Sequence, residues 1–274
     1  MEEFFELDGY RIFAKVEGDG QPLLLLHSYW GGQCLFDRLA VSLSSHMKVI
    51  RIDLPGHGKS GTPPDDYTFD RFAVVINKLL SGLHIEGKVS VIGHSMGGYI
   101  AMAFASVYPE RIASLILMHS PTKAADLQSI RLRDREGRLL VKGKRDLLLQ
   151  LTIPSNFAPV NLCTMKSEME MLEKTCSEVT LEGALGSIHA INNRANSLNV
   201  LRNAQYPILI IIGKYDRVYS ATEQLDDATQ ISNAEVLLLE KSGHLGFMEE
   251  EDLVGRRLYA FLEIISQKSP PNHG

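Results

Sequence analysis

The stretch "GKVSVIGHSMGGYIAMAFASVYPER", residues 87–111, holds the pattern that decides the fold. Apolar residues alternate in its first part as they do in a strand, and the part after the glycines reads as a helix. Between the two, Ser95 stands in the pattern G-x-S-x-G. Where such a pattern joins a strand to a helix, the turn is sharp and strained, and it projects the serine hydroxyl above the sheet. The stretch therefore predicts a nucleophilic serine at position 95.

The rest of the chain repeats the order of strand and helix. Residues 4–18, "FFELDGYRIFAKVEG", have the pattern of a hairpin around an Asp-Gly turn. Further strand-like runs, separated by helical segments, are "PLLLLHS" (22–28), "MKVIRIDL" (47–54), "RIASLILMHS" (111–120), "YPILIIIG" (206–213) and "AEVLLLE" (234–240). This alternation predicts an α/β protein whose mostly parallel central sheet is flanked by helices on both faces.

Residues 121–205 lack strong strand-like runs. Three helix-leaning segments fill this part of the chain instead: "IRLRDREGRLLVKGKRDLLLQL", "MKSEMEMLEKTCSEV" and "LEGALGSIHAINNRANSLNVL". We therefore expect a core domain formed by residues 1–120 and 206–274, with residues 121–205 inserted as a helical cap (a lid) over the serine.

The composition argues against several classes of protein. Of the 274 residues, 45% are hydrophobic and 22% charged, which is ordinary for a soluble globular protein. The net charge of −5 argues against a nucleic-acid-binding protein, and no apolar run approaches the ~20 residues that a membrane span needs. The acidic N-terminus lacks the apolar stretch of a signal peptide, and the three cysteines are an odd number, widely spread. We expect reduced thiols and a cytoplasmic location, and a homodimer stays open.

A serine hydroxyl is a weak nucleophile, so the chemistry needs a base and a carboxylate that orients this base. In this architecture the acid and then the histidine follow the serine along the chain. Asp216 comes three residues after "ILIIIG", and His244 lies just beyond "AEVLLLE", so both are expected on loops at the same sheet edge as Ser95. Asp126 is an alternative acid, farther from the end of its strand. We predict a catalytic triad of Ser95, Asp216 and His244.

The tetrahedral intermediate of acyl transfer needs hydrogen-bond donors for its oxyanion. The backbone N–H of Met96, the residue after the nucleophile, is the first expected donor. The second should come from the loop "HSYWGG", residues 27–32, which follows the first apolar strand. His27, His57 and Asp53 are expected to fix loops through hydrogen bonds rather than to react.

Five motifs together carry a family resemblance. "LLLHSYWGG" (24–32) resembles the His-Gly oxyanion loop of α/β-hydrolases, "DLPGHGKS" (53–60) the loop after their fourth strand, and "GHSMGG", "GKYD" and "SGH" their triad positions. The chain resembles the capped, esterase- and lipase-like branch of that superfamily. The resemblance implies the backbone N–H of Tyr29 as the second oxyanion donor, with Ser28 standing where the family usually has glycine. It also implies hydrolysis of a carboxylic ester or thioester of a small molecule, without a cofactor.

Four further residues are candidates for contact with the substrate. Ser28 and Trp30 belong to the oxyanion loop, His119 ends a strand near the site, and Phe247 follows the catalytic histidine. No pair among the nine histidines has the spacing of metal ligands, so we expect no metal site. Nothing in the sequence suggests a base for Cys34.

Two classes of function stay open at this point. The first is a serine hydrolase, and the second is a small-molecule receptor or binding module that keeps the same fold. Among enzymes, an acyltransferase and a non-hydrolytic lyase of the superfamily are further alternatives. A complete triad favours the hydrolase, because a binding module has no use for an activated nucleophile.

The first part of the expected cap is rich in positive charge. Residues 131–146 contain seven basic residues (Arg131, Arg133, Arg135, Arg138, Lys142, Lys144 and Arg145) and three acidic ones (Asp134, Glu136 and Asp146). The simpler interpretation is a solvated helix face laced with i, i+4 ion pairs. The alternative is that one or two of the arginines point inward and bind a carboxylate or phosphate of the substrate.

Overall fold

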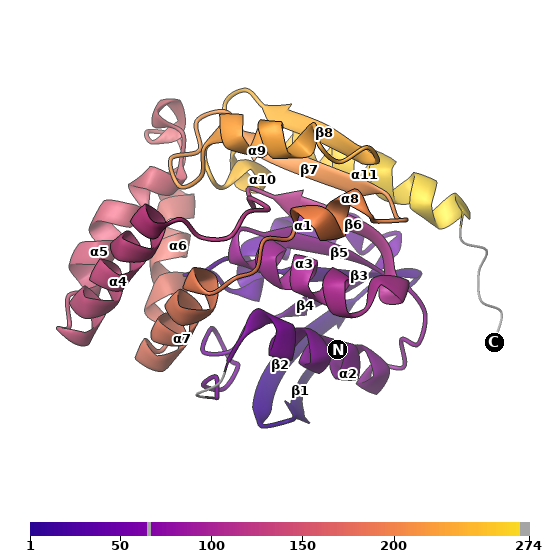
Figure 1. Ribbon diagram of the computed structural model, residues 1–274, viewed down its shortest axis with the longest axis horizontal. Helices are drawn as coiled ribbons and strands as arrows, with labels where there is room; N and C mark the ends of the chain where they lie inside the picture. Colours follow the sequence, from indigo (N-terminus) through magenta and orange to yellow (C-terminus); the bar gives the residue numbers. More distant parts are fainter. Residues whose placement is uncertain (65–66, 269–274) are drawn as a thin grey trace.

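An eight-stranded sheet, in the order β1-β2-β4-β3-β5-β6-β7-β8, forms the centre of the computed structural model, which describes residues 1–64 and 67–268. Figure 1 shows helices on both sides of this sheet. The strands are β1 (Glu2–Leu7), β2 (Tyr10–Glu17), β3 (Gln21–Leu26), β4 (Met47–Ile52), β5 (Val89–His94), β6 (Ile112–Met118), β7 (Ile208–Gly213) and β8 (Ala234–Leu239). The α-helices are α1 (Asp37–Leu43), α2 (Phe69–Gly82), α3 (Met96–Val107), α4 (Leu127–Val141), α5 (Arg145–Thr152), α6 (Lys166–Ser177), α7 (Leu181–Asn192), α8 (Leu198–Arg202), α9 (Ala221–Ala228), α10 (Gly246–Glu249) and α11 (Glu251–Lys268).

The first two strands form the hairpin that the sequence predicts. Asp8 (φ 50°) and Gly9 (φ 83°) make its turn, and positive φ at both central residues is what a type I′ hairpin turn requires. Strand β2 also pairs antiparallel with β4. Every other pairing, from β4 through β3 and β5 to β8, is parallel. The prediction of a mostly parallel sheet is therefore confirmed.

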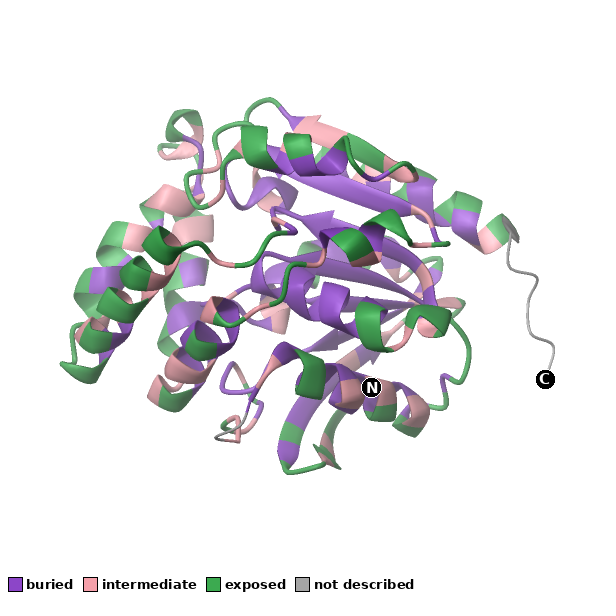
Figure 2. Cartoon of the chain, viewed as in Figure 1, coloured by how far each residue is buried: buried purple, intermediate pink, exposed green. Residues whose placement is uncertain are grey.

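Alternate side chains of the central strands fill two apolar layers. Leu24 and Leu26 of β3 point into one layer with α2, α3 and α8, whereas Leu23 and Leu25 point into the other with α1 and α11. Because both faces are covered, the central strands are apolar throughout rather than alternately polar and apolar. Figure 2 shows these buried strands between helices whose outer faces are exposed.

Between β6 and β7 the described chain forms helices and no strand, as the sequence predicts for this region. Helices α4 to α7 lie together to one side of the sheet (Figure 1). Helix α8 differs, because its Leu198 and Leu201 are buried in the same layer as α2 and α3. The division of the chain into a core and a cap at residues 121 and 205 stays a prediction.

Two further features concern the cysteine thiols and the length of the helices. The thiols of Cys34, Cys163 and Cys176 are all free, and that of Cys176 is buried. Across residues 1–64 and 67–268, no helix has both the length and the apolar character needed to cross a bilayer.

Candidate active site

Ser95 occupies the strained turn between β5 and α3. Its backbone has φ 53° and ψ −114°, a left-handed conformation that is rare for a residue with a side chain. The turn fits only because its neighbours lack side chains. A Cβ on Gly97 would lie 2.0 Å from the Leu26 carbonyl oxygen, and one on Gly93 would lie 2.5 Å from the Gly97 carbonyl oxygen. The glycines of the motif are therefore required by the backbone itself.

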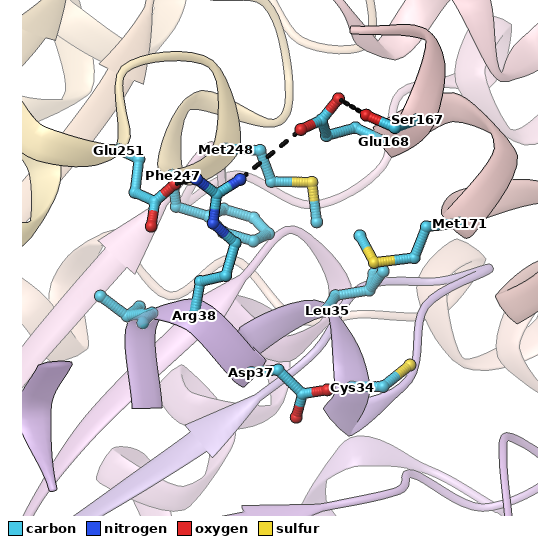
Figure 3. Close-up of a pocket in the computed structure, with 11 residues that line it drawn as sticks. Cys34, Leu35, Asp37, Arg38, Ser167, Glu168, Met171, Phe247, Met248 and Glu251 are labelled. Atoms are coloured by element: carbon cyan, nitrogen blue, oxygen red, sulfur yellow. Dashed lines mark hydrogen bonds and ion pairs between the residues drawn. The ribbon is translucent and has the colours of Figure 1, made fainter. Parts of the chain in front are cut away.

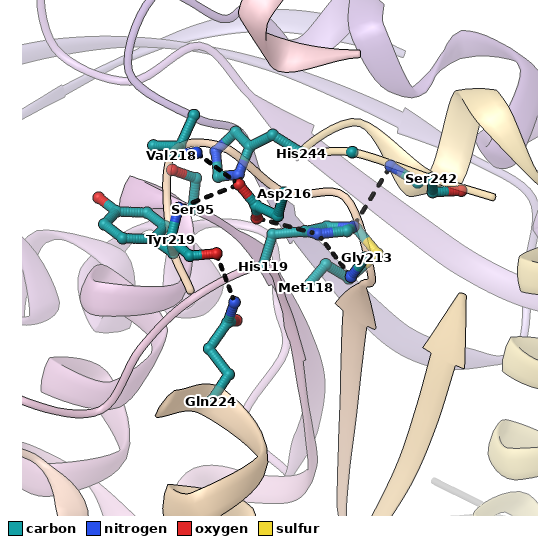
Figure 4. A network of polar contacts seen from close by, with 12 residues as sticks. Ser95, Met118, His119, Gly213, Asp216, Val218, Tyr219, Gln224, Ser242 and His244 are labelled. Carbon is teal, nitrogen blue, oxygen red and sulfur yellow. Dashed lines mark hydrogen bonds and ion pairs between the residues drawn. The ribbon is translucent and has the colours of Figure 1, made fainter. Parts of the chain in front are cut away.

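Asp216 and His244 lie beside each other on the loops after β7 and β8. The distance from His244 Nδ1 to Asp216 Oδ2 is 2.9 Å (Figure 4). The other carboxylate oxygen, Oδ1, accepts hydrogen bonds from the backbone N–H groups of Val218 and Tyr219 at 2.8 and 3.0 Å. These contacts fix the carboxylate in one orientation, so that Oδ2 holds the imidazole of His244.

Burial and charge oppose each other at Asp216. Burial of its side chain would raise the pKa of the carboxyl group, but the charge that His244 carries when protonated and the hydrogen bonds from His244 and His119 outweigh burial and hold this pKa well below its usual range. Asp216 is therefore ionised at neutral pH and able to stabilise a proton on His244.

The sequence suggests that His119 contacts substrate, but the structure places its side chain in the core. It is fully buried behind Asp216, with Nδ1 3.4 Å from Asp216 Oδ2, and among the described residues it does not line the cavity beside Ser95. Backbone N–H groups of Gly213 and Gly246 approach Nδ1 and Nε2, each at 3.3 Å. Only one nitrogen of a neutral ring can accept a hydrogen bond. The carboxylate favours the proton on Nδ1, which leaves Nε2 to accept from Gly246.

One ring nitrogen of His119, one ring nitrogen of His244 and a carboxylate oxygen of Asp216 lie within 4.8 Å of one another. A metal ion held between Asp216 Oδ2 and the two Nδ1 atoms would need a lone pair from each of these nitrogens. Instead, both Nδ1 atoms face the oxygen Oδ2, where each is best used as an N–H donor. The cluster is therefore better suited to hold protons than to hold a cation.

A cavity of about 170 Å³ lies next to Ser95 and His244. The loop after β3 contributes Ser28, Tyr29 and Trp30 to its wall. Helices α4, α6 and α7 and the end of α5 supply further lining residues: Arg133, Glu136, Thr152, Leu172, Cys176 and Ile191. The region predicted as a cap therefore forms part of the wall around the serine. Of the four substrate candidates, Ser28 and Trp30 line this cavity.

Two backbone N–H groups are available near the serine. Met96 is the first residue of α3, so its N–H has no partner within the helix, and the positive end of the helix dipole lies there. Among the described residues, neither the Met96 N–H nor the Tyr29 N–H donates a hydrogen bond. The side chains of Tyr29 and Trp30 are held from the opposite wall, because Tyr29 Oη and Trp30 Nε1 both donate to Glu136 Oε1 at 2.9 Å.

Phe247 does not meet the expectation that it contacts substrate beside Ser95. Its ring packs against Phe36 and against His94, with centroid distances of 5.2 and 5.0 Å. It lines a separate pocket of about 160 Å³ (Figure 3), where Arg38 bridges Glu168 of α6 and Glu251 of α11 at 3.5 and 2.6 Å. The sequence placed Phe247 correctly near His244 but could not show that the side chain turns into the core.

The loop-fixing roles expected for three buried polar residues are confirmed. His27 Nε2 accepts from the Leu54 N–H at 2.9 Å while Nδ1 donates to the Ser28 carbonyl at 2.8 Å. His57 Nδ1 lies 3.0 Å from the Pro55 carbonyl oxygen. The two carboxylate oxygens of Asp53 accept from the backbone N–H groups of residues 33 and 59. These bonds hold the oxyanion loop against the loop after β4.

Two other candidates are explained by local structure. The carboxylate of Asp126 is exposed and caps α4 by accepting from the Ser129 N–H at 2.7 Å, whereas the carboxylate that contacts His244 is that of Asp216. The thiol of Cys34 lies 3.5 Å from Thr175 Oγ1, and burial raises its pKa, which makes it a poor nucleophile.

Comparisons with known proteins agree with this fold. A family model described as the alpha/beta hydrolase fold matches residues 21–251. A dihydrolipoyllysine-residue acetyltransferase component of the acetoin cleaving system of Pseudomonas putida is 31% identical over 94% of this chain. The chain spans 66% of the length of that relative and 37% of the length of three mycobacterial relatives. Lipase 1 of Psychrobacter immobilis is 25% identical, with 90% of the chain and 78% of the lipase aligned. A thermophilic esterase from Thermogutta terrifontis superposes with a TM-score of 0.92 at 22% identity, covering 97% of this chain and 99% of the esterase. The chain belongs to the alpha/beta hydrolase fold family.

Proposed function

We propose that this chain is a serine hydrolase that cleaves a carboxylic ester or thioester of a small molecule through an acyl-enzyme intermediate. One observation carries the proposal. Ser95, on a strained turn, and His244, held by Asp216, line the same cavity. A nucleophile, a base and an orienting acid on three loops at one sheet edge are the parts that acyl transfer needs.

Each group then has a role in the reaction. Ser95 Oγ attacks the substrate carbonyl carbon while His244 Nε2 takes the serine proton. The negative charge that develops on the carbonyl oxygen is stabilised by the backbone N–H groups of Met96 and Tyr29. His244 returns the proton to the departing alcohol or thiol, which leaves the acyl group on Ser95. Water attacks the acyl-enzyme while His244 Nε2 takes a proton from it, and His244 then returns this proton to Ser95 Oγ as the carboxylic acid departs. Asp216 stabilises the imidazolium in both halves of the cycle.

Ser28 and Trp30 are proposed to contact the substrate, since both line the cavity beside the oxyanion donors. Two of the named relatives, a lipase and an esterase, support ester bonds as the target. The acetyltransferase name of another relative supports acyl transfer as a second candidate, in which an acceptor other than water takes the acyl group from Ser95. The two share every step up to the acyl-enzyme.

Hydrolysis of 4-nitrophenyl acetate and butyrate tests the proposal. Wild-type protein should release nitrophenol, and Ser95→Ala and His244→Ala should each remove nearly all turnover. Asp216→Asn keeps the shape but offers the wrong tautomer of His244, a change that costs on the order of 10⁴ in a serine-protease triad. Wild-type activity in the Ser95→Ala protein would overturn the assignment. A receptor or binding module would show no turnover above that variant.

A further inference from the structure

One arginine of the predicted cap reaches the cavity that contains Ser95. Arg133 of α4 lines this cavity, and its Nη2 donates to Tyr219 Oη at 3.0 Å. Its Nη1 is buried and, among the described residues, has no hydrogen-bond partner. A buried donor without an acceptor is rare in native proteins, because it costs about 1–3 kcal/mol. In a substrate cavity, the acceptor is expected to come from the ligand.

The other arginines of the same helix behave differently. Arg131, Arg135 and Arg138 are exposed, whereas Arg133 is partly buried. The interpretation as a solvated helix face therefore fits the three exposed arginines, and the interpretation as an inward-pointing side chain fits Arg133. Most of the positive charge faces solvent, and Arg133 alone among these four faces the serine.

Arg133 also has no acidic side chain bound to it. In the described ranges, the one hydrogen bond of its guanidinium goes to a phenol, and no ion pair involves it. Glu136 lies one turn further along α4 and lines the same cavity, but its Oε1 is occupied by Tyr29 Oη and Trp30 Nε1. The guanidinium therefore retains a full charge and at least two free N–H groups, enough for a bidentate contact.

We propose that Arg133 is an anion subsite that binds a carboxylate at the far end of the ester. The reaction in which this subsite would serve rests on the proposed function, whereas the binding itself does not. A single guanidinium matches the single charge of a carboxylate. A phosphate dianion fits less well, because Glu136 would repel its second charge in a cavity of about 170 Å³.

The carboxylate can sit on either part of an ester, so two sets of substrates are needed. The acyl-side set contains the monomethyl esters of succinate, glutarate and adipate. The alcohol-side set contains the acetate esters of glycolate, 3-hydroxypropanoate and 4-hydroxybutanoate. Each is compared with its neutral methyl ester, which has nearly the same shape. The variants are Arg133→Gln and, as matched control, Arg135→Gln, which removes an exposed guanidinium from the same helix.

In one of the two sets, Arg133→Gln should lower kcat/KM for the charged ester by roughly 10- to 100-fold, the value of a hydrogen bond to a charged group, and leave the neutral ester almost unchanged. Arg135→Gln should change neither. Glu136→Gln should increase the preference for the charged ester, because it removes the opposing charge and keeps an acceptor for Tyr29 and Trp30. Equal losses on charged and neutral esters in both sets would overturn the proposal.

A binding measurement separates this proposal from the proposed chemistry. In the Ser95→Ala protein, titration calorimetry with succinate, glutarate and adipate should give a dissociation constant that rises 10- to 100-fold when Arg133→Gln is added. If the wild-type protein hydrolyses no ester, the proposed function fails, and this titration still decides the role of Arg133. Dicarboxylate binding that is equal with and without Arg133, or absent from the Ser95→Ala protein, rejects the subsite.

Discussion

Asp216 is held by more partners than a triad needs. Its Oδ1 accepts two backbone N–H groups, and its Oδ2 faces His244 on one side and His119 on the other (Figure 4). Burial lowers the pKa of His119, although the Asp216 carboxylate acts in the opposite direction. We therefore expect His119 to be neutral and to position the Asp216 carboxylate rather than to contact the substrate.

Replacing His119 should therefore reduce the rate of reaction without weakening substrate binding. His119→Gly removes the N–H donor, and glycine adopts the positive φ of this position (52°) without strain. We expect kcat to fall by roughly 10-fold, the lower end of the range for one hydrogen bond to a charged group, with KM unchanged. The matched control is His84→Gly, since His84 also has positive φ (58°) but is exposed. A rise in KM with kcat unchanged would instead mean that His119 contacts the substrate.

At the scale of elements, the site depends on close packing between β3 and the start of α3. Gly97 touches the end of β3 so closely that a methyl group would overlap the Leu26 carbonyl oxygen. Since Leu26 leads directly into the loop that carries Tyr29, a shift there would also move the Tyr29 N–H, which we propose as the second oxyanion donor. The position of Gly97 therefore affects both the turn that carries Ser95 and the loop that carries Tyr29.

Gly97→Ala should destabilise the protein and impair turnover together. We expect a loss of about 1–3 kcal/mol in the free energy of unfolding, as for other overpacked sites, and a fall in kcat. Gly255→Ala in α11 is the control, because a Cβ there meets nothing within 4 Å. It should stabilise the protein by about 1 kcal/mol, the difference in helix propensity. Urea unfolding measures the free energy of unfolding of both variants. Equal values for Gly97→Ala and Gly255→Ala would contradict the packing argument.

Elements and their order were accessible to sequence reasoning, but side-chain direction was not. The buried strands carry continuous apolar runs, so their number, and the loops that hold Ser95, Asp216 and His244, could be predicted. We expect contact with substrate from His119 because it ends a strand and from Phe247 because it follows His244, yet both side chains turn into the core. Arg133 could not be distinguished from its exposed neighbours, since the direction of each arginine depends on how α4 packs over the sheet.

At the scale of the whole molecule, buried histidines link stability to pH. His27 and His57 are both fully buried, and burial lowers the pKa of His27 to about 4 and that of His57 to about 3. In the unfolded chain both titrate near ~6.5. Between these values the unfolded state binds more protons than the folded state, so stability rises with pH across this window. The stability is fully present above pH ~6.5 and is lost as the pH falls toward 4 and then 3.

The free energy of unfolding should therefore fall on acidification from pH 7.5 to 5.0. Each of the two histidines contributes a loss on the order of 2 kcal/mol at pH 5, at about 1.4 kcal/mol per pH unit below ~6.5. His57→Gln removes one titrating group and should reduce the pH dependence by about that amount. His189→Gln, at an exposed imidazole, is the control and should keep the wild-type slope. Urea unfolding at the two pH values checks this, and a slope unchanged by His57→Gln would refute it.

We propose that the acyl group passes through Ser95, and this covalent intermediate can be trapped. Wild-type protein is mixed with 4-nitrophenyl butyrate, quenched in acid within milliseconds, digested and analysed by mass spectrometry. We predict a butyryl group on the peptide that contains Ser95, present during turnover and absent from the Ser95→Ala protein. An acyl group on another residue, or steady turnover with no acylated peptide at any quench time, would contradict the account.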